Sequence, residues 1–367
     1  MLYKLYWGKI LLLGGLLSIV GPGPAAFAQQ WAYPVPVNEG WVLVSGEGQR
    51  LSAEVYDSVA LRPGGWYQTY RSGRTGLRDS TGELVLRAVY HRLHPPGRHN
   101  RIAAEKPPGQ WYLFDLSGRV ASPQPYDELG PFRNGSAPLR MGRRWGYCDA
   151  KGAFLLPPQF DAALPMSEGY GAVQAAGKWT LVSPEGDFVT EPQYDSLGRL
   201  QNGRAPVWQH GHAGFLSPKG QVAIEFMFED VRGFRRGKAP VKLLGKWGLV
   251  DRKGSYLATA AYQNVGSCSS FGCSVQQNGR WGLLDNSGLP VRGGFRYRNA
   301  PQFREGRAAV ATDDGWGYIS PRGEVLLPFE YNAATPFRQG RAVVQTAQGA
   351  WVLINTAGEV VTRPKLD

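Results

Sequence analysis

Acidic residues that follow an aromatic residue recur along the chain, and paired carboxylates are the first chemistry to consider. Asp57, Asp127, Asp161 and Asp195 each come directly after Tyr or Phe. Two carboxylates at a set separation would suit glycoside hydrolysis. A catalytic residue should interrupt a repeating pattern, however, and these residues follow one. Their spacing therefore favours a structural role, such as Asx-type hydrogen bonds that hold a connection.

Motifs of other catalytic classes are missing from the sequence. It contains no Gly-x-Ser-x-Gly, no His-Glu-x-x-His and no Gly-x4-Gly-Lys-Ser/Thr. The stretch from Gly171 to Lys178 resembles a phosphate loop, but its glycine spacing differs and Trp179 stands where Ser or Thr is required. We therefore predict a protein that is not an enzyme and that needs no cofactor.

Histidines form two small groups. His91, His94 and His99 lie close together, and His210 and His212 flank a glycine. Imidazoles on one loop can converge on a metal ion. No cysteine or carboxylate completes a recognisable ligand pattern, and two consecutive prolines stiffen the first loop. Exposed loop histidines are the favoured interpretation, and no metal site is predicted.

Three cysteines are too few for a disulfide-rich scaffold. Cys268 and Cys273 occupy positions that hold apolar residues in other parts of the chain. They fit two small buried side chains, or a disulfide if the protein reaches an oxidising compartment. Cys148 stands at a position that holds Val or Ile elsewhere and is predicted to lie in the core.

These residues belong to a unit that returns about every 34 residues. Thr75 and Ala213 mark two copies that have lost the usual tryptophan, and every copy keeps a small polar residue four residues after this position and a glycine seven residues after it. This Asp/Ser-x-x-Gly step predicts a hairpin turn, because the short polar side chain can bond backbone N–H groups and the glycine can adopt a positive φ. A step such as Gly306-Arg307-Ala308 closes the unit. The remaining copies carry the tryptophan itself, at Trp41, Trp111, Trp145, Trp179, Trp247, Trp281, Trp316 and Trp351.

The unit resembles the WG repeat of bacterial proteins. Gly245-Lys246-Trp247-Gly248, Asp251 and Gly254 carry the resemblance, together with the Gly-Arg-Ala step and the aromatic–acid pair. The likeness extends from about Trp41 to the C-terminus. It implies a repeat architecture and no shared catalytic residues.

The unit predicts an all-β protein. Short apolar runs bounded by Gly, Pro and Asp recur, whereas no window keeps helical spacing over three turns. We expect about ten three-stranded units stacked in a continuous array over residues 39–367, after a lead-in segment or cap at residues 29–38. Propellers typically have about four to eight four-stranded blades. Ten smaller units therefore favour an open twisted β-solenoid over a closed propeller.

The first 28 residues have the pattern of a secretory signal. Lys4 and Lys9 precede a short apolar run, and Ala26-Phe27-Ala28 fits a cleavage site. We expect cleavage near Ala28 and a periplasmic or secreted protein. No later stretch is long and apolar enough to span a membrane.

The chain is basic, with a formal net charge of +12. Arg204, Lys238, Arg307 and Arg341 recur in register, so stacked repeats would align them. Such a row could face an anionic envelope polymer, or it could keep strand edges soluble. Export disfavours nucleic acid as the partner.

Aromatic residues suggest two different roles. The anchoring tryptophans are flanked by Gly and apolar residues, which predicts rings buried in the core. Trp208 lies outside that register, beside His210 and His212, and marks a candidate ligand surface; packing on the next unit is its alternative. Trp66 and Tyr67 are further candidates for stacking on sugars.

Together these features predict an exported, non-enzymatic repeat protein. Its long surface would bind a protein partner or an envelope polymer, or would serve as a scaffold without a ligand. The alternative is a carbohydrate-binding or carbohydrate-active envelope protein. The oligomeric state does not follow from the sequence.

Overall fold

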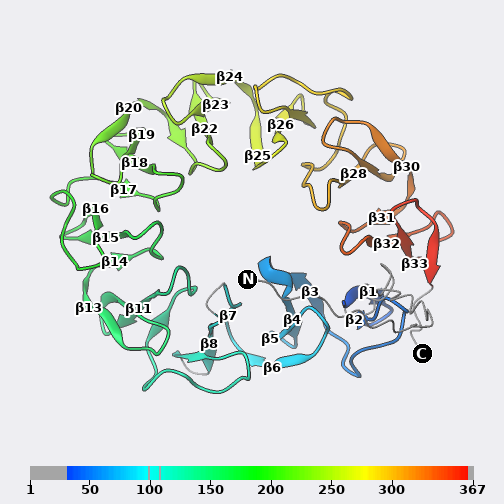
Figure 1. Ribbon diagram of the computed structural model, residues 1–367, viewed down its shortest axis with the longest axis horizontal. Helices are drawn as coiled ribbons and strands as arrows, with labels where there is room; N and C mark the ends of the chain where they lie inside the picture. The colour runs from blue at the N-terminus through cyan, green and yellow to red at the C-terminus, as the bar shows by residue number, and fades with distance from the viewer. Residues whose placement is uncertain (1–30, 98–99, 107–108, 363–367) are drawn as a thin grey trace, which may run out of the picture.

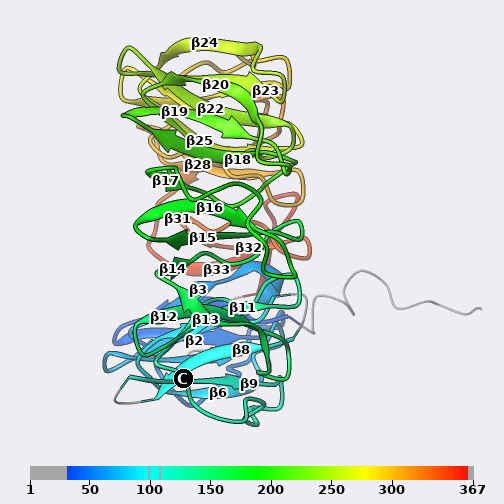
Figure 2. The ribbon, with the colours of Figure 1, turned by 90° about the vertical axis from the view of Figure 1, so that its left-hand side faces the viewer.

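The computed structural model describes residues 31–97, 100–106 and 109–362. These residues form a ring of antiparallel sheets, here called blades (Figure 1). Nine blades have three or four strands, and a smaller two-stranded sheet, β1–β2, stands between the blades β31–β34 and β3–β6. Viewed from the side, the blades succeed one another around the ring (Figure 2).

Strands are named by their order within a blade. First strands lie nearest the centre of the ring in Figure 1; they are β3 (Ser58–Leu61), β7 (Leu93–His94), β10 (Glu128–Leu129), β14 (Ala162–Ala163), β17 (Ser196–Leu197), β21 (Asp230–Val231), β25 (Asn264–Ser269) and β31 (Ala333–Ala334). Second strands are β1 (Tyr33–Val37), β4 (Tyr67–Arg71), β8 (Ile102–Lys106), β11 (Ala137–Met141), β15 (Gly171–Ala175), β18 (Ala205–Gln209), β22 (Lys238–Leu243), β26 (Gly272–Gln277), β28 (Ala308–Ala311) and β32 (Arg341–Gln345).

Third strands carry the repeat anchor. They are β2 (Gly40–Val44), β5 (Arg74–Arg78), β9 (Gln110–Phe114), β12 (Arg144–Cys148), β16 (Lys178–Val182), β19 (His212–Leu216), β23 (Lys246–Asp251), β27 (Arg280–Leu284), β29 (Trp316–Ile319) and β33 (Trp351–Asn355). Fourth strands run along the outside of the ring in Figure 1; they are β6 (Leu84–Tyr90), β13 (Phe154–Phe160), β20 (Val222–Phe228), β24 (Tyr256–Tyr262), β30 (Val325–Tyr331) and β34 (Val360–Thr362). A 3-10 turn, η1 (Pro63–Gly65), precedes β4.

The anchor position pairs with the aromatic residue that follows it in the repeat. Trp247 lies opposite Tyr262, and the register then shifts so that Leu249 pairs with Ala258. This bulge brings the fourth strand across Gly248, where an added Cβ would meet the Ala258 carbonyl oxygen at 2.7 Å. The glycine after the tryptophan is thus required by close approach of the backbone.

The repeated Asp/Ser-x-x-Gly step forms the turn between third and fourth strands, as predicted. Asp149 Oδ1 accepts hydrogen bonds from the backbone N–H groups of Lys151, at 2.8 Å, and Ala153, at 2.9 Å. Gly152 adopts a φ of +81°, which is unfavourable for residues with a Cβ. Both residue types are therefore explained by local backbone geometry.

The acid that follows the aromatic residue joins neighbouring blades. Asp195 Oδ2 accepts the backbone N–H of His210 at 2.7 Å, in the turn between β18 and β19. Its Oδ1 accepts Lys178 Nζ of the preceding blade at 2.6 Å. Lys178 and the His210 N–H both lower the pKa of Asp195. Both carboxylate oxygens of Asp195 accept hydrogen bonds within the protein, so this side chain has a structural role.

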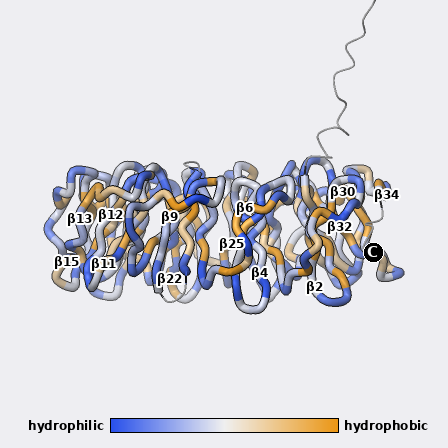
Figure 3. Tube along the Cα trace, turned by 90° about the horizontal axis from the view of Figure 1, so that it is seen from below, coloured by the Kyte–Doolittle hydropathy of each residue, from blue (hydrophilic) through white to orange (hydrophobic). Residues whose placement is uncertain are grey.

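Hydrophobic side chains pack between successive blades. In one such cluster Phe215 and Phe228 of β19 and β20 meet Val231, Val241 and Val250 of the next blade. Hydrophilic segments gather at the turns on both rims of the ring (Figure 3). Among the anchoring tryptophans, Trp111 and Trp247 are 1% and 8% exposed. The others are half-buried, at Trp41, Trp145, Trp179, Trp281, Trp316 and Trp351.

The expectation of an open solenoid of three-stranded units is wrong, because the array closes on itself. Tyr33, Val35 and Val42 at the start of the described chain share a core with Val343 and Leu353 of the last blade. Figure 1 shows β1 and β2 beside β32 and β33. Closure buries two apolar faces that an open array would expose. The fold is therefore a closed β-propeller.

Strand number was also underestimated. Most first strands have only two residues and follow the aromatic–acid pair directly, so they are too short to show an alternating strand pattern in the sequence. Five blades consequently have four strands rather than three.

Several predicted segments fall partly outside the described residues. The signal segment 1–28 and residues 29–30 of the lead-in segment lie there, as do residues 363–367. The rest of the lead-in segment includes Trp31 and β1, which pack where the ring closes. A helix with the length and hydrophobicity needed to cross a bilayer does not occur among the described residues.

Candidate functional site at the tip turns

A four-residue pattern, Phe-Arg-x-Gly, shapes the turn between first and second strands in several blades. We call these turns the tip turns. In each copy x and Gly both have positive φ, as at Asn134-Gly135, Arg236-Gly237, Glu305-Gly306 and Gln339-Gly340. Phe132, Phe234 and Phe337 are buried beneath the turn, and Phe303 is half-buried. The pattern therefore fixes its arginine at one place on the rim, in the copies Arg133, Arg235, Arg304 and Arg338.

Neighbouring tip turns are hydrogen-bonded to one another. Glu168 accepts the backbone N–H groups of Asn202 and Gly203 at 2.6 and 2.8 Å. Asn202 Oδ1 in turn accepts the N–H of Gly237 at 3.0 Å. Glu305 binds the N–H groups of the next tip turn in the same manner. These hydrogen bonds orient several neighbouring tip turns relative to one another.

The arginines of the pattern differ in how they are used. Arg133, Arg235 and Arg304 are exposed, and their side chains have no hydrogen bond or ion pair within the described part of the chain. Arg338 is half-buried where the two ends of the described chain meet. Three free guanidinium groups on one rim favour an anionic partner.

Arg338 holds the ring closed. Its Nη1 donates to Tyr67 Oη at 2.6 Å and its Nη2 donates to the Gly65 carbonyl oxygen at 3.2 Å. Its guanidinium carbon lies 3.8 Å from the ring centroid of Trp31, a cation–π contact. Burial lowers the pKa of Arg338 and raises that of Tyr67 to about 12. Arginine remains charged and tyrosine neutral at pH 7.

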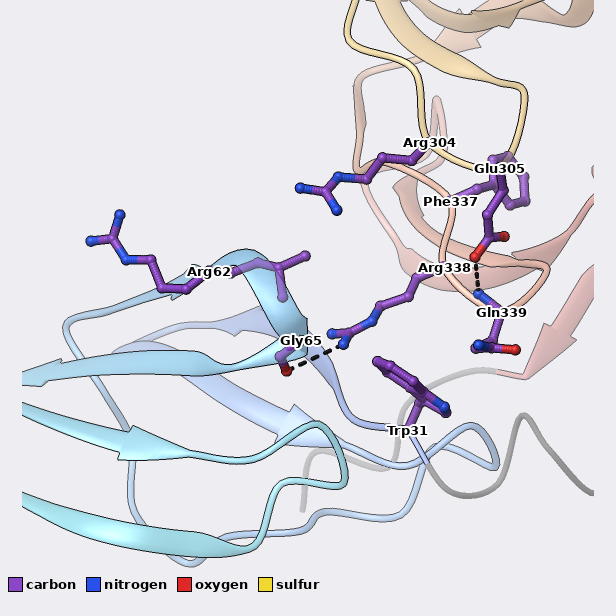
Figure 4. A pocket seen from close by; sticks show the side chains of 9 residues that line it. Trp31, Arg62, Gly65, Arg304, Glu305, Phe337, Arg338 and Gln339 are labelled. Carbon is purple, nitrogen blue, oxygen red and sulfur yellow. Dashed lines mark hydrogen bonds between the residues drawn. The ribbon is translucent and has the colours of Figure 1, made fainter. Parts of the chain in front are cut away.

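A cavity of about 320 Å³ opens beside this contact, and we call it the closure pocket. Figure 4 shows Arg62 and Gly65 on one side, facing Arg304 and Arg338 on the other. Its lining residues are Trp31, Leu61, Arg62, Gly65, Arg304, Glu305, Phe337, Arg338 and Gln339. The volume lies at the lower end of the range for small-ligand sites.

A second cavity of about 330 Å³ lies on the tip turns of the blades β14–β16, β17–β20 and β21–β24. Glu168, Gln201, Asn202, Arg235 and Arg236 contribute polar groups to it. Both cavities therefore lie on the rim that carries the tip turns.

The basic row predicted from the sequence serves the structure instead. Arg204 Nε donates to the Arg252 carbonyl oxygen at 3.3 Å, and Lys238 Nζ donates to Asn286 Oδ1 at 2.8 Å. Arg341 donates to the Gly46 carbonyl oxygen across the point of closure. Each reaches the Asp/Ser-x-x-Gly turn of the next blade. Arg307 instead lies over the Phe337 ring, with 5.3 Å between guanidinium carbon and centroid.

Burial supports the same conclusion for Lys238. It is only 8% exposed, and burial lowers its pKa. These four side chains link blades and do not form an open basic stripe.

The candidate surface at Trp208 is partly occupied by the next blade. Trp208 is half-buried, and its Nε1–H donates to Asp230 Oδ1 at 3.2 Å. His210 and His212 are exposed in the turn, with His212 Nδ1 3.2 Å from the His210 carbonyl oxygen. The structure therefore matches the packing alternative for this tryptophan.

Tyr67 and Trp66, the candidates for stacking on sugars, also contact other parts of the ring. Tyr67 is 1% exposed and donates to the Ala32 carbonyl oxygen. Trp66 is half-buried and packs against the cluster around Leu77 and Leu86. Neither presents an open aromatic face of the kind that sugars stack on.

The cysteines and histidines have definite surroundings. A disulfide joins Cys268 to Cys273, and Cys148 is a buried free thiol whose pKa is raised to about 12 by burial. His94 stacks on Trp111, with ring centroids 5.2 Å apart, and burial lowers its pKa. His99 lies outside the described residues. No cluster of potential metal ligands occurs in the described ranges.

The Phe-Arg-x-Gly arginines were missed in the sequence analysis, although a signal for them exists. The closing glycine of this pattern is part of the Gly-Arg-Ala step described from the sequence, but the arginine two residues before it was not singled out there. Its recurrence at a fixed distance from two structural residues marks a position held on the rim.

One protein-family model matches four segments of the chain. The model described as "WG containing repeat" matches residues 145–179, 179–211, 214–247 and 316–347. The chain contains WG repeats. Three of the matched segments begin at an anchor, namely Trp145, Trp179 and Trp316. In the repeats that begin at Trp145 and Trp316, the tryptophan pairs with the later aromatic residue and the glycine admits the bulged fourth strand. No curated protein matches the chain.

Solved structures resemble this chain at low sequence identity. A crystal structure of a eukaryotic initiation factor has a TM-score of 0.50 and 8% identity, covering 91% of this chain and 95% of that one. BamB from Moraxella catarrhalis gives a TM-score of 0.35 and 11% identity over 86% and 91% of the two chains. The C-terminal WD40 domain of Sif2 gives 0.39 and 11% over 70% and 89%. The last two values are too low to support an argument.

Proposed function

We propose that this WG-repeat propeller is an exported, non-enzymatic protein that binds a protein partner on the rim of its tip turns. The observation that carries the proposal is the fixed position of Arg133, Arg235 and Arg304 on that rim, exposed and without a side-chain partner in the described chain. The turns that carry them are hydrogen-bonded to neighbouring turns, so we expect that little ordering is needed on binding. An acidic face on the partner would complement these charges.

Export rests on the residue pattern of the first 28 positions and gains support from the disulfide. Disulfides persist in oxidising compartments such as the periplasm and the extracellular space. A periplasmic or secreted location is accordingly part of the proposal.

A protein partner is preferred to a carbohydrate because the aromatic candidates are already engaged. Trp208 is hydrogen-bonded to the next blade, and Tyr67 is buried at the point of closure. The available surface is instead basic and built from turns.

The test is affinity capture from an envelope extract of the source organism, with two double variants. Arg235→Gln/Arg304→Gln removes two charges from the tip-turn rim. Arg143→Gln/Lys246→Gln removes two exposed charges from the turns between second and third strands, at the opposite rim. We expect a partner that binds the wild type and the opposite-rim variant but is reduced at least ~10-fold with the tip-rim variant.

Equal capture by all three proteins would contradict binding at this rim. Loss with both variants would show that binding depends on net charge alone. Thermal melts of the three proteins check that folding is unchanged, as expected for exposed side chains.

A further inference from the structure

Positive charge gathers in the closure pocket from both ends of the chain. Arg62 comes from the segment that leads into η1, and Arg304 and Arg338 come from two successive tip turns. The carboxylate of Glu305 is directed to the backbone N–H groups of Gln339 and Gly340, at 2.6 and 3.0 Å. Three guanidinium groups and one carboxylate therefore line the cavity, so positive charge is in excess, and that carboxylate already accepts two backbone hydrogen bonds.

Arg62 and Arg304 keep terminal guanidinium nitrogens that have no acceptor in the described chain. Arg62 uses Nε and Nη2 to donate to Gln68 Oε1 at 2.7 Å and to Tyr70 Oη at 2.9 Å, so its Nη1 is unused. Arg304 keeps its whole fork, because its side chain makes no bond among the described residues. Figure 4 shows Arg304 above Arg338 on one side of the pocket, with Arg62 on the opposite side.

Contacts within the protein hold the guanidinium groups of Arg62 and Arg338 in position. The Arg62 fork is fixed by its two acceptors, and Arg338 is immobilised between Trp31, Tyr67 and Gly65. The repulsion between Arg304 and Arg338 is one cause of the lowered pKa of Arg338. An anion between the guanidinium groups would relieve that repulsion.

We propose that the closure pocket binds a carboxylate side chain of an acidic peptide segment. A guanidinium fork matches the planar geometry of a carboxylate, and Arg304 offers a free fork for a bidentate pair. Trp31 and Leu61 supply apolar surface in the lining for the methylene stem of Glu or Asp. This proposal rests on the proposed function, since it specifies the chemistry of the partner at one place on the same rim.

Such a ligand would also stabilise the ring. It would contact Arg62 from the beginning of the described chain and Arg304 from its last third, across the closure. A ligand that binds only the closed form shifts the folding equilibrium toward that form. Binding should therefore raise the melting temperature as well as produce a calorimetric signal.

The test is a titration of the purified protein with a hexaglutamate peptide at low salt, followed by calorimetry and by thermal melting. We expect binding by the wild type and a rise in melting temperature. Arg304→Gln should weaken binding at least ~10-fold and abolish the rise. Arg235→Gln, the same position in a blade away from the closure, should stay within about twofold of wild type.

Titrations with two other compounds test which kind of group the pocket binds. Hexaglutamine should not bind, since it lacks charge. Inorganic phosphate that raised the melting temperature as much as hexaglutamate would assign the pocket to a small anion and overturn the peptide. Equal weakening by Arg304→Gln and Arg235→Gln, or no binding at all, would also overturn the proposal.

These results can be separated from the fate of the proposed function. If hexaglutamate does not bind but partner capture is still lost in the tip-rim double variant, the rim binds a protein and the pocket is not its carboxylate site. If capture fails while hexaglutamate binds through Arg304, the pocket takes carboxylates but the rim does not recruit a partner.

Discussion

Two interfaces in the ring use equivalent turns but different contacts. Between the blades β17–β20 and β21–β24, Gln201 lies close to Gly233, where an added Cβ would meet Gln201 Oε1 at 2.5 Å. At the closure, Arg338 occupies the place of Gln201, and an added Cβ on Gly65 would meet Arg338 Nη2 at 2.5 Å. The amide of the ordinary interface is thus replaced by a guanidinium that reaches Trp31 and Tyr67.

The difference follows from chain connectivity. At the ordinary interface the chain passes directly from β20 to β21, so the two blades cannot separate far. At the closure no chain segment connects the last blade to the β1–β2 sheet. Side-chain contacts alone hold β1 against β32 and β33. A charged side chain with several partners and a cation–π contact provides more stabilisation than one amide. Arginine is common at this position of the tip turn, but at the closure its guanidinium contacts Trp31 and Tyr67 and so helps to join two parts of the chain that no direct covalent connection holds together.

The largest effect is expected from Trp247→Ala, which tests an ordinary interface. The ring is nearly buried and carries the Arg232 guanidinium at 4.2 Å from its centroid. Removing it should lower the free energy of unfolding by about 3–5 kcal/mol in urea melts. A loss under ~1 kcal/mol would mean that the ring contributes little packing, and it would reopen a ligand-binding role for the anchor.

A smaller effect should distinguish the two interfaces directly. Arg338→Ala removes a cation–π contact and leaves Tyr67 and Gly65 without their donor, so it should cost about 2–3 kcal/mol. Gln201→Ala should cost about 0.5–1 kcal/mol. Chemical denaturation of both variants measures this difference. Equal costs would show that the closure has no special need for arginine.

The smallest effect concerns pH. Burial raises the pKa of Tyr67 from 10.0 to about 12, so the unfolded chain loses this proton first as pH rises. The stability contributed by the neutral phenol is complete below pH 10 and is lost between about pH 10 and 12. Between pH 9 and pH 11 the wild type should therefore lose about 1 kcal/mol more unfolding free energy than Tyr67→Phe.

Urea melts at pH 9 and pH 11 provide the measurement. Substitution with phenylalanine also removes hydrogen bonds, so only the change with pH is informative. Parallel losses in the two proteins would show that Tyr67 ionises in the folded ring as easily as in the unfolded chain.

Several local features of each blade could be predicted from the sequence. The Asp/Ser-x-x-Gly turns were correctly predicted because a short polar side chain and a residue of positive φ act on their own backbone. The structural role of the acid after the aromatic residue was also anticipated, although its partner was not. Asp195 binds His210 in the following hairpin and Lys178 in the preceding blade, contacts that depend on blade packing.

The candidate site was predicted less well, for a physical reason. Arginines with a free side chain cannot be distinguished in the sequence from basic residues that bind the next blade, because both recur with the period of the repeat. Arg204 and Lys238 are committed to the next blade, whereas Arg235 and Arg304 are free. Only the position of the neighbouring turn decides between these outcomes.

The sequence by itself determined the repeat, its all-β character and its turns, since these depend on residues close together in the chain. Tertiary structure alone decided that the array closes. Closure depends on the rotation between successive blades, summed around the ring until β1 meets the last blade, and no single repeat encodes that sum. The same closure brings Arg62 and Arg304, far apart in sequence, to opposite sides of one pocket.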